Sequence, residues 1–473
     1  ILIGAMYVRI IQRVFRPNDV GTMELQDDSH ETSEPQLTKE KLDELDLHFA
    51  GYGECEHCGE YKTDIRWCTT CNAEHFSKLQ WESGNNIIDN FIRSIQSRAT
   101  NHHKILEWVS FKNFENVKYI AEGGYGIVYK AKWKGGRILY FDSETQDWKR
   151  SGDMDVVLKS LHDSKDITKE FFNEIDGQMK SHYELGNTIE CFGITKDPNT
   201  ENFMMIMKFM KDGSLRDYIR NKFSTLTWIQ KLEILYTAAK GLCNIHEVNL
   251  IHKDLHTGNI VLYDQVSYIT DFGFCKPANY EMPEGAKNGE IFGVLPYIAP
   301  ENLCGEKHSM ATDIYAFGII MNEVASGCPP FYDKKHDSGL ALEINDGSRP
   351  VSCENITPPL IIDLIKRCWN KNPEERPQAK ELQKCLGDWY FQSKSESFHE
   401  IKDQIEKIEK SQNFEKYLSS IPCKSTSSEF HNSYTSSKVS IVKSVRVPHI
   451  ESASDSGVYN LTIPDENDEV NNN

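Results

Sequence analysis

The sequence predicts an α+β protein whose globular part begins with strands and continues with helices. Two patterns carry this prediction: apolar alternation punctuated by glycines comes first, and apolar residues at helical spacing dominate from about residue 212. A third observation is that Ser, Thr, Asn and acidic residues dominate from 424 onward, and such a segment cannot bury enough apolar surface to fold. The chain has 473 residues, 39% of them hydrophobic, so it can bury a sizeable core in two or three domains.

These shifts in composition divide the chain into five segments. They are a mostly disordered N-terminal segment (1–50), a cysteine-rich module (51–82), a helical linker (83–111), a globular domain (112–390), and a helix followed by a disordered Ser-rich tail (391–473). Within the last segment, residues 396–418 predict an exposed helix with Ile401, Ile405 and Ile408 on one face. An insert at 135–155 suggests no function.

Charge and cysteine usage narrow the class of protein. The net charge of −18 argues against a nucleic-acid partner. The most apolar stretch, at the N-terminus, is interrupted by Arg9 and Arg13, so we expect neither a membrane span nor a signal peptide. Thirteen cysteines, scattered except for one cluster, favour a reducing compartment, and we expect a cytoplasmic protein.

Glycines and a paired lysine suggest a phosphate site. Gly123, Gly124 and Gly126 lie in a short loop before an alternating strand pattern, where bare backbone N–H groups can hold phosphate, although ordinary hairpin turns also use such glycines. Lys159 ends the apolar strand pattern DVVLKSL, and Glu174 lies in a helical stretch that follows. A buried lysine needs a carboxylate partner, which Glu174 can supply.

The stretch IHKDLHTGNIVLYDQVSYITDFG, at 251–273, holds three polar residues beside apolar runs. These are Asp254, Asn259 and Asp271, and the runs around them are typical of buried strands or turns. An unpaired buried carboxylate is costly, so each aspartate needs a cation or a chemical role.

In order, these motifs resemble those of the eukaryotic protein kinase superfamily: a glycine loop, V-x-x-K, a helix glutamate, H-K-D-L-x-x-x-N, D-F-G and A-P-E. The resemblance covers 112–390. It implies a bilobal fold, with a small lobe of antiparallel sheet and one helix (112–207), a hinge (208–211) and a large helical lobe (212–390). It also implies ATP and Mg²⁺ as cofactors and proteins as substrates.

The resemblance gives each charged residue a role. Lys159 would hold the α- and β-phosphates, and Glu174 would hold Lys159 in place. Asp254 would accept the proton of the incoming hydroxyl. Asn259 and Asp271 would bind magnesium, which prefers such oxygen ligands.

The resemblance also implies a nucleotide pocket, in which Met207 would be the gatekeeper and the backbone of Lys208 and Met210 would bind adenine. The residues implied to contact the nucleotide are Gly123, Gly124, Gly126, Val128, Val157, Lys159, Glu174, Met207, Lys208, Met210 and Val261. In addition, Asp313 would brace the catalytic loop, and Glu301 would pair with Arg376.

Three departures from the family pattern concern regulation and acceptor choice. Lys253 replaces the usual arginine before Asp254 and lacks its planar fork. Residues 271–301 contain no Ser or Thr, so we expect no Ser/Thr phosphorylation switch there. His256 stands where Ser/Thr kinases usually carry lysine. With its flanking sequence, it resembles the tyrosine-kinase-like group, particularly the expanded fungal kinases, whose members mostly modify Ser/Thr.

The cysteine cluster predicts a zinc site. Cys55, Cys58, Cys68 and Cys71 form two C-x-x-C pairs, and four thiolates can complete a tetrahedral site that leaves no position open for chemistry. The alternative of four reduced core cysteines stays open, and His57 and His75 are backup ligands. The lead-in 51–76 resembles the Cys-rich segment of the same fungal kinases.

Three functions follow from these observations. The first is a protein kinase that transfers the ATP γ-phosphoryl group to protein Ser/Thr hydroxyls, with Tyr as a less favoured acceptor. The second is a pseudokinase scaffold that binds nucleotide and partners. The third is an interaction protein whose cysteine-rich module binds the partner, with the kinase-like domain as regulator.

Overall fold

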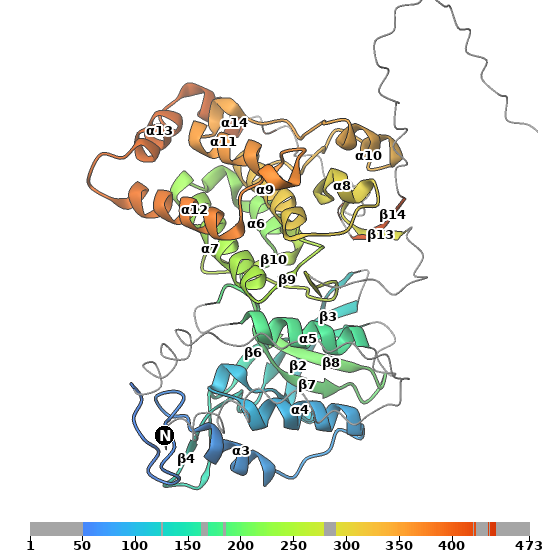
Figure 1. Ribbon diagram of the computed structural model, residues 1–473, viewed down its shortest axis with the longest axis vertical. Coiled ribbons are helices and arrows are strands. Elements are labelled where there is room, and N and C mark those ends of the chain that lie inside the picture. Colours follow the sequence, from blue (N-terminus) through green and yellow to red (C-terminus); the bar gives the residue numbers. More distant parts are fainter. Residues whose placement is uncertain are drawn as a thin grey trace, which may run out of the picture.

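The computed structural model has two lobes, stacked one above the other in Figure 1. It describes residues 51–123, 126–161, 169–182, 186–278, 290–419, 421, 434 and 436–440. The predicted N-terminal segment 1–50 and the loop glycine Gly124 therefore lie outside the described residues. No helix of the described part is long and apolar enough to span a bilayer.

The small lobe is built on a six-stranded sheet with the order β1-β7-β8-β6-β3-β2. Its strands are β1 (Glu107–Trp108), β2 (Phe114–Gly123), β3 (Gly126–Trp133), β6 (Met154–Leu161), β7 (Cys191–Lys196) and β8 (Phe203–Lys208). Strand β1 pairs in parallel with β7, and the other pairs are antiparallel. Along β6, Val156 and Leu158 are fully buried. Because side chains alternate across a sheet, Val157 and Lys159 lie on the opposite face.

Helix α5 (Lys169–Ser181) lies on the side of the small lobe that faces the large lobe (Figure 1). Phe171 and Ile175, four residues apart, share one helix face and are fully buried. The predicted linker helix is α4 (Asn86–Arg98), whose side chains Ile88, Ile92 and Ile95 are buried. It packs toward α5, since the rings of Phe91 and Phe172 lie edge to face at 4.8 Å.

The insert at 135–155 forms a hairpin of β4 (Ile138–Asp142) and β5 (Asp147–Arg150) that packs on the cysteine-rich module. Trp148 of the hairpin stacks on Phe76 of α3 (Thr69–Ser77) at 4.3 Å, and Phe141 stacks on His75 at 3.6 Å. The insert, which suggested no function in the sequence, therefore closes an apolar core against the module.

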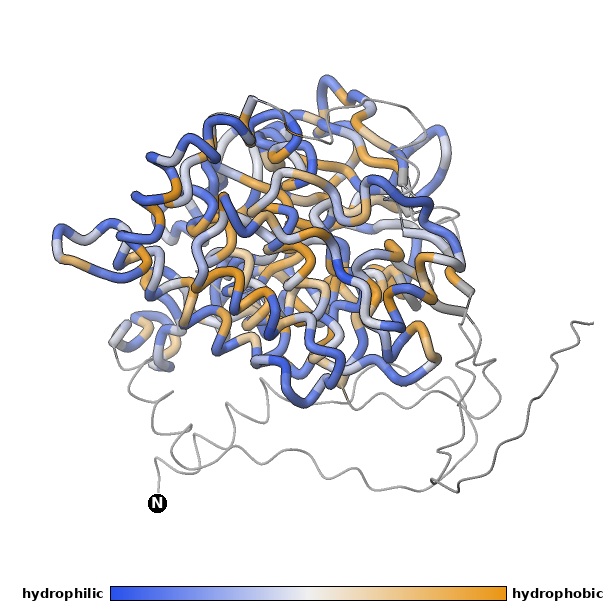
Figure 2. Tube along the Cα trace, turned by 90° about the horizontal axis from the view of Figure 1, so that it is seen from above, coloured by the Kyte–Doolittle hydropathy of each residue, from blue (hydrophilic) through white to orange (hydrophobic). Residues whose placement is uncertain are grey.

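The large lobe is helical and centres on α7 (Trp228–Glu247), which begins with a capping box between Thr227 and Gln230. Its other helices are α6 (Leu215–Lys222), α8 (Pro300–Leu303), α9 (Met310–Ser326), α10 (Ser338–Asn345), α11 (Pro359–Cys368) and α12 (Ala379–Lys394). Nearly every residue of α9 is buried. Figure 2 shows apolar segments gathered inside the molecule and polar ones in the outer loops.

Short elements complete the described chain. The two-stranded pairs are β9 (Leu250–Ile251) with β12 (Lys276–Pro277), β10 (Ile260–Tyr263) with β11 (Val266–Ile269), and β13 (Glu290–Gly293) with β14 (Ser437–Ser440). The 3₁₀ helices are η1 (His102–Lys104), η2 (Phe111–Asn113), η3 (Phe223–Thr225), η4 (Thr257–Asn259), η5 (Leu295–Tyr297), η6 (Glu354–Ile356) and η7 (Pro373–Glu375).

The helix predicted as exposed at 396–418 is two helices packed on the large lobe, α13 (Glu400–Glu409) and α14 (Gln412–Ser419). Ile401 and Ile405 are buried, which corrects the prediction of exposure. The apolar stripe of α13 is covered because it turns toward α12. Most of the tail predicted as disordered lies outside the described residues, but Tyr434 and 436–440 contact the large lobe.

Lys231 of α7 is fully buried among aromatic rings. Its Nζ lies 3.9 Å from the centre of the Phe223 ring and 4.7 Å from that of Trp228, and it donates to the Ala325 carbonyl oxygen at 3.3 Å. Burial lowers the pKa of Lys231 to about 7, although the charge of Glu409 acts against this.

This buried lysine predicts a pH dependence of stability. Between the folded pKa of about 7 and the unfolded value of about 10.4, only the unfolded chain holds the proton, so this residue makes stability rise by about 1.4 kcal/mol per pH unit. Relative to a Lys231→Met variant, the native protein should therefore gain stability from pH 7.5 to 9. Urea unfolding at both pH values measures this gain. Parallel changes in the two proteins would contradict it, and the exposed Lys222→Met is the matched control.

Candidate active site

Lys159, at the end of β6, joins the two lobes. Its Nζ lies 2.7 Å from Glu174 Oε1 of α5 and 3.0 Å from Asp271 Oδ1 of the large lobe. Lys159 and Glu174 are both buried. Burial lowers the pKa of Lys159, but the charges of Asp271 and Glu174 outweigh it, so the net pKa is raised and the side chain stays an ammonium. The predicted pairing of Lys159 with Glu174 is therefore present, and Asp271 lies within reach of the same ammonium.

Helix α5, which carries Glu174, is held at its C-terminal end by the segment that precedes the small lobe. Lys104 Nζ donates hydrogen bonds to the backbone oxygens of Met179 and His182, in the last turn of α5 and just after it. A cation at this end of a helix is favourable, because the last carbonyl groups lack helical partners. The segment before residue 112 thus supports the helix that positions Glu174.

The loop that carries Asp254 is braced by Asp313 of α9. The Asp313 carboxylate accepts the backbone N–H of His252 at 2.8 Å and of Lys253 at 3.0 Å, and its Oδ2 lies 3.0 Å from His246 Nε2. Lys253 has a φ of +70°, a strained backbone conformation that these bonds hold in place. The contacts agree with the bracing role that the resemblance implied for Asp313.

Asp254 is buried beside Asn259. The Asn259 Nδ2 group donates to the Asp254 backbone oxygen at 2.9 Å and lies 3.3 Å from its Oδ2. Burial raises the pKa of Asp254, but His256 and the hydroxyl of Ser436 lower it to about 2 overall. Asp254 is therefore a carboxylate at neutral pH and acts as a hydrogen-bond acceptor.

Asp271 and Asn259 can both offer oxygen atoms to a cation. Because Asn259 Nδ2 is used toward Asp254, its Oδ1 is the atom left for a ligand. Asp271 has a φ of +66°, and the ring of the next residue, Phe272, is buried against Gly177 of α5. Two oxygen donors beside an ammonium that can bind phosphate fit a magnesium ion, which prefers a few carboxylate ligands plus phosphate oxygens.

The residues predicted to contact adenine come from strands β3, β6, β8 and β10 and from the hinge that follows β8. Val157 on β6 lies opposite Met207 on β8, and Val128 on β3 lies opposite Lys159. Val261 on β10 follows in the large lobe, where it pairs with Ser214 just after the hinge. Lys208 ends β8, Met210 follows it, and Gly123 and Gly126 end β2 and begin β3. Apart from Gly124, the predicted nucleotide residues all fall within the described chain.

The predicted ion pair between Glu301 and Arg376 is present and bidentate. The two Arg376 Nη atoms lie 2.6 and 2.8 Å from the two Glu301 carboxylate oxygens, and Arg376 is buried. Arg376 also donates to the Ala311 backbone oxygen at 2.9 Å, so this arginine fastens the A-P-E motif to the start of α9.

Tyr297, one of the two hydroxyl-bearing residues in 271–301, is not available at the surface. Its hydroxyl lies 3.2 Å from Thr257 Oγ1 and donates to the buried carboxylate of Glu323. Tyr280, the other one, lies outside the described residues. The expectation of no Ser/Thr phosphorylation switch in this segment stays a prediction.

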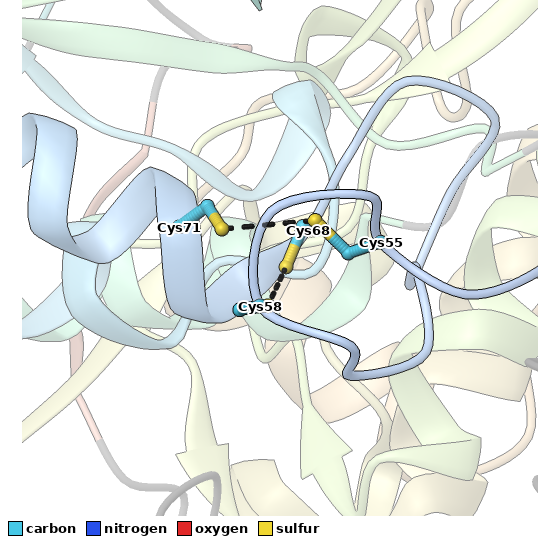
Figure 3. A group of neighbouring side chains, drawn as sticks. All are labelled: Cys55, Cys58, Cys68 and Cys71. Atoms are coloured by element: carbon cyan, nitrogen blue, oxygen red, sulfur yellow. Dashed lines mark hydrogen bonds between the residues drawn. The ribbon is translucent and has the colours of Figure 1, made fainter.

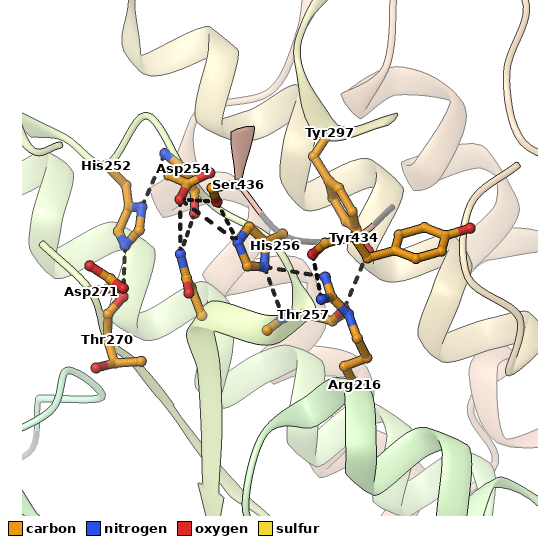
Figure 4. A network of polar contacts seen from close by, with 12 residues as sticks. Arg216, His252, Asp254, His256, Thr257, Thr270, Asp271, Tyr297, Tyr434 and Ser436 are labelled. Carbon is orange, nitrogen blue, oxygen red and sulfur yellow. Dashed lines mark hydrogen bonds and ion pairs between the residues drawn. The ribbon is translucent and has the colours of Figure 1, made fainter. Parts of the chain in front are cut away.

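Sequence patterns did not identify two residues that lie at the loop of Asp254. His256 stood out only as a departure from the kinase family pattern, and Ser436 did not stand out at all. Ser436 Oγ lies 2.6 Å from Asp254 Oδ2 and 3.3 Å from His256 Nε2 (Figure 4). Ser436 falls in a Ser-rich tail with no motif around it, so local sequence offered no signal for it.

The four cysteines of the module converge on one point, as Figure 3 shows. The Sγ atoms of Cys55 and Cys71 are 3.7 Å apart, those of Cys58 and Cys68 are 3.5 Å apart, and all four lie within 4.8 Å of one another. A tetrahedral zinc ion with Zn–S bonds of about 2.3 Å sets its sulfurs about 3.8 Å apart. The thiol cluster therefore fits zinc.

The backup ligands His57 and His75 are not in that group within the described part of the chain. His75 stacks on Phe141 instead. Burial raises the pKa of the Cys55 thiol, but backbone N–H groups of Cys58 and His57 lower it to about 7. Such N–H groups favour the thiolate form that metals bind.

Two lobes joined by a lysine–carboxylate contact, together with an aspartate loop braced by a buried carboxylate, are the arrangement of the bilobal kinase fold. Residues 114–386, more than half of the chain, match the model of the protein tyrosine and serine/threonine kinase family. The chain belongs to this family, whose members use ATP and Mg²⁺.

The chain is similar to kinases of several organisms. R831 of Acanthamoeba polyphaga mimivirus, described as a serine/threonine-protein kinase/receptor, is 31% identical over 294 residues, which are 60% of this chain and 17% of that protein. The serine/threonine-protein kinase shk1/pak1 of Schizosaccharomyces pombe is 27% identical over 57% of this chain and 37% of its own length. The tyrosine-protein kinase receptor svh-2 of Caenorhabditis elegans is 27% identical over 58% and 24%. The chain thus spans well under half of each of these relatives.

Proposed function

We propose that this protein is an ATP-dependent protein kinase that phosphorylates Ser and Thr residues in preference to Tyr. The observation that carries the proposal is the contact of Lys159 Nζ with both Glu174 and Asp271. In protein kinases the lysine–glutamate pair and the metal-binding aspartate must both be in place for transfer. A pseudokinase that only binds nucleotide would not need this arrangement together with an ionised Asp254.

The contacts of these residues support the roles that we propose for them. Lys159 binds the α- and β-phosphates, and Glu174 keeps its ammonium group oriented. Asp254 orients the acceptor hydroxyl and takes its proton. The residues proposed to surround the nucleotide are Gly123, Gly124, Gly126, Val128, Val157, Met207, Lys208, Met210 and Val261.

Asn259 and Asp271 are proposed to hold magnesium. When bound, the ion supplies positive charge beside the phosphate oxygens, where negative charge builds during transfer. Asn259 Nδ2 is fixed by the Asp254 backbone oxygen at 2.9 Å, and this contact supports a fixed position for Asn259 Oδ1.

The short distance between a bound peptide backbone and Asp254 supports serine or threonine as the acceptor. A serine side chain, that of Ser436, reaches Asp254 Oδ2 at 2.6 Å while the residues after it pair with β13. A tyrosine hydroxyl lies several ångströms further from its own backbone, so a tyrosine substrate would need its backbone further from Asp254 than that of Ser436. The names of R831 and of shk1/pak1 point the same way, whereas svh-2 is named a tyrosine kinase.

We further propose a place within the superfamily and a role for the lead-in. His256 and its flanking sequence favour the tyrosine-kinase-like group, as in the fungal kinases with a Cys-rich lead-in. Cys55, Cys58, Cys68 and Cys71 are proposed to bind a structural zinc ion. Reduced cysteines elsewhere in the chain favour a cytoplasmic location.

The purified full chain tests the function directly when it is incubated with casein, Mg²⁺ and ATP. We expect phosphoserine and phosphothreonine on casein, little phosphotyrosine, and no transfer when EDTA removes magnesium. Predominant phosphotyrosine would contradict the acceptor preference. Nucleotide binding without any transfer would favour the pseudokinase alternative and overturn the proposal.

A further inference from the structure

A segment of the C-terminal tail lies in the active site. Strand β14 (Ser437–Ser440) pairs antiparallel with β13 (Glu290–Gly293), which follows the D-F-G segment, and Ser437 lies opposite Gly293. The pairing fixes the backbone next to Ser436, which precedes the strand. An extended peptide added to an exposed strand is a common mode of peptide recognition, because main-chain hydrogen bonds give affinity and side-chain pockets give specificity.

The Ser436 hydroxyl is placed for proton transfer. An ionised carboxylate can only accept, so Ser436 donates its O–H to Asp254 Oδ2 at 2.6 Å. His256 Nδ1 accepts the backbone N–H of Gly258 at 3.0 Å, which puts the proton of a neutral ring on Nε2. That Nε2–H lies 3.3 Å from Ser436 Oγ. The oxygen is thus held between a proton acceptor and a donor, within the distance that general-base catalysis requires.

A second anchor holds the segment two residues earlier. Arg216 of α6 donates to the Tyr434 backbone oxygen at 2.6 Å, and its guanidinium lies over the Tyr434 ring at 5.5 Å. The Tyr434 side chain is buried, and its hydroxyl donates to the Pro330 backbone oxygen at 3.0 Å. The ring of His336 meets it edge on at 4.6 Å. A pocket for Tyr434 and a strand after Ser436 thus fix one serine at the catalytic carboxylate.

We propose that Ser436 is an autophosphorylation site and that Tyr434 and 436–440 bind the substrate groove as an intramolecular substrate. The inference rests on the proposed kinase activity. In the reaction, Ser436 Oγ attacks the γ-phosphorus of ATP and forms a new P–O bond. The bond from that phosphorus to the β,γ-bridging oxygen breaks, and ADP leaves with its electron pair. Asp254 takes the hydroxyl proton.

The phosphorylated segment should bind less well at Asp254 than the unmodified segment does. A phosphoserine carries about −1.5 to −2 charges at neutral pH, and it would lie beside the carboxylate of Asp254, which Ser436 Oγ already contacts at 2.6 Å. Like charges in a buried site repel strongly, so the modified segment leaves. Phosphorylation of Ser436 therefore frees the groove for other protein substrates.

Mass spectrometry of the full chain, incubated with Mg²⁺ and ATP at two concentrations 100-fold apart, tests the proposal. We expect one phosphate on Ser436, formed at the same fractional rate at both concentrations, as an intramolecular reaction requires. Ser437→Ala, which changes the neighbouring exposed hydroxyl, should keep this phosphate. Ser436→Ala should lose it and should phosphorylate added casein more slowly, without the rise in rate that release of the tail gives the native chain.

The outcomes separate this inference from the proposed function. If the native chain phosphorylates casein but leaves Ser436 unmodified, or carries the phosphate on Ser437 instead, the inference is overturned and the kinase activity stands. A fractional rate that rises with protein concentration overturns the intramolecular reaction. If neither casein nor the tail is phosphorylated, both proposals fall.

Discussion

Replacing Asp254 with asparagine is expected to lower kcat for phosphoryl transfer by about 10²–10⁴-fold, the usual contribution of a positioned proton acceptor. The amide has nearly the shape of the carboxylate but cannot take a proton. The backbone oxygen of Asp254, which holds Asn259, is retained in the variant. Lys159 contacts Glu174 and Asp271, and the substitution changes neither contact, so ATP binding should persist. Steady-state kinetics with casein and titration of a fluorescent ATP analogue measure the two effects.

The control for this variant is Asp363→Asn, because Asp363 lies on the exposed face of α11. It makes the same chemical change far from the catalytic loop and should leave kcat and nucleotide affinity unchanged. An Asp254→Asn protein with more than a tenth of native kcat would show that another group accepts the proton. A joint loss of transfer and ATP binding would indicate a misfolded loop, and circular dichroism would then report the change.

Removal of zinc is expected to unfold the cysteine-rich module outright. Structural zinc contributes roughly 10–16 kcal/mol of apparent binding free energy in small zinc domains at neutral pH, more than such a module can replace by packing. The core beside the four sulfurs is small and contains Trp67, Phe76, Ala99, Ile105 and Ile138. Cys68→Ser, or a zinc chelator, should therefore expose Trp67 and Trp148 to water, which a red shift of tryptophan fluorescence would show.

Unfolding of the cysteine-rich module should also lower the activity of the active site. Ala99 and Ile105 of that core flank the segment that includes Lys104, whose ammonium binds the carbonyls at the end of α5. Without this support α5 should shift, the contact between Lys159 and Glu174 should be populated less, and kcat should fall. Elemental analysis should find one zinc per native chain, and Cys385→Ser in α12 is the control. A zinc-free protein with native melting temperature and activity would contradict the assignment.

The charged residues of the site were predictable because each belongs to a short motif with fixed spacing. Asp254 and Asn259 are separated by five positions on one loop, and Asp271 is the first residue of the D-F-G motif. The alternation of β6 places Lys159 on the same face as Val157, and helical periodicity places Glu174 on the inward face of α5. Such patterns can be recognised in the sequence because each of them lies within a single strand, helix or loop.

Other features depended on contacts between distant segments. The insert at 135–155 showed no pattern of its own, yet it supplies Trp148 to the core of the module. The helix at 396–418 looked exposed because its apolar stripe is narrow, but α12 covers that stripe. In both cases the burial of the segment depends on a surface that is distant in the sequence and close in the fold. A local sequence pattern carries no information about such a surface.

By itself, the sequence determined the class of this protein and its two lobes, and it named the candidate site residues and the four candidate zinc ligands. Only the tertiary structure decided that the lead-in supports α5 and that Ser436 reaches Asp254. The physical reason is the separation in sequence between the residues that interact. Periodicity and motif spacing record interactions within one element, whereas a contact between residues 182 positions apart depends on the packing of the whole chain.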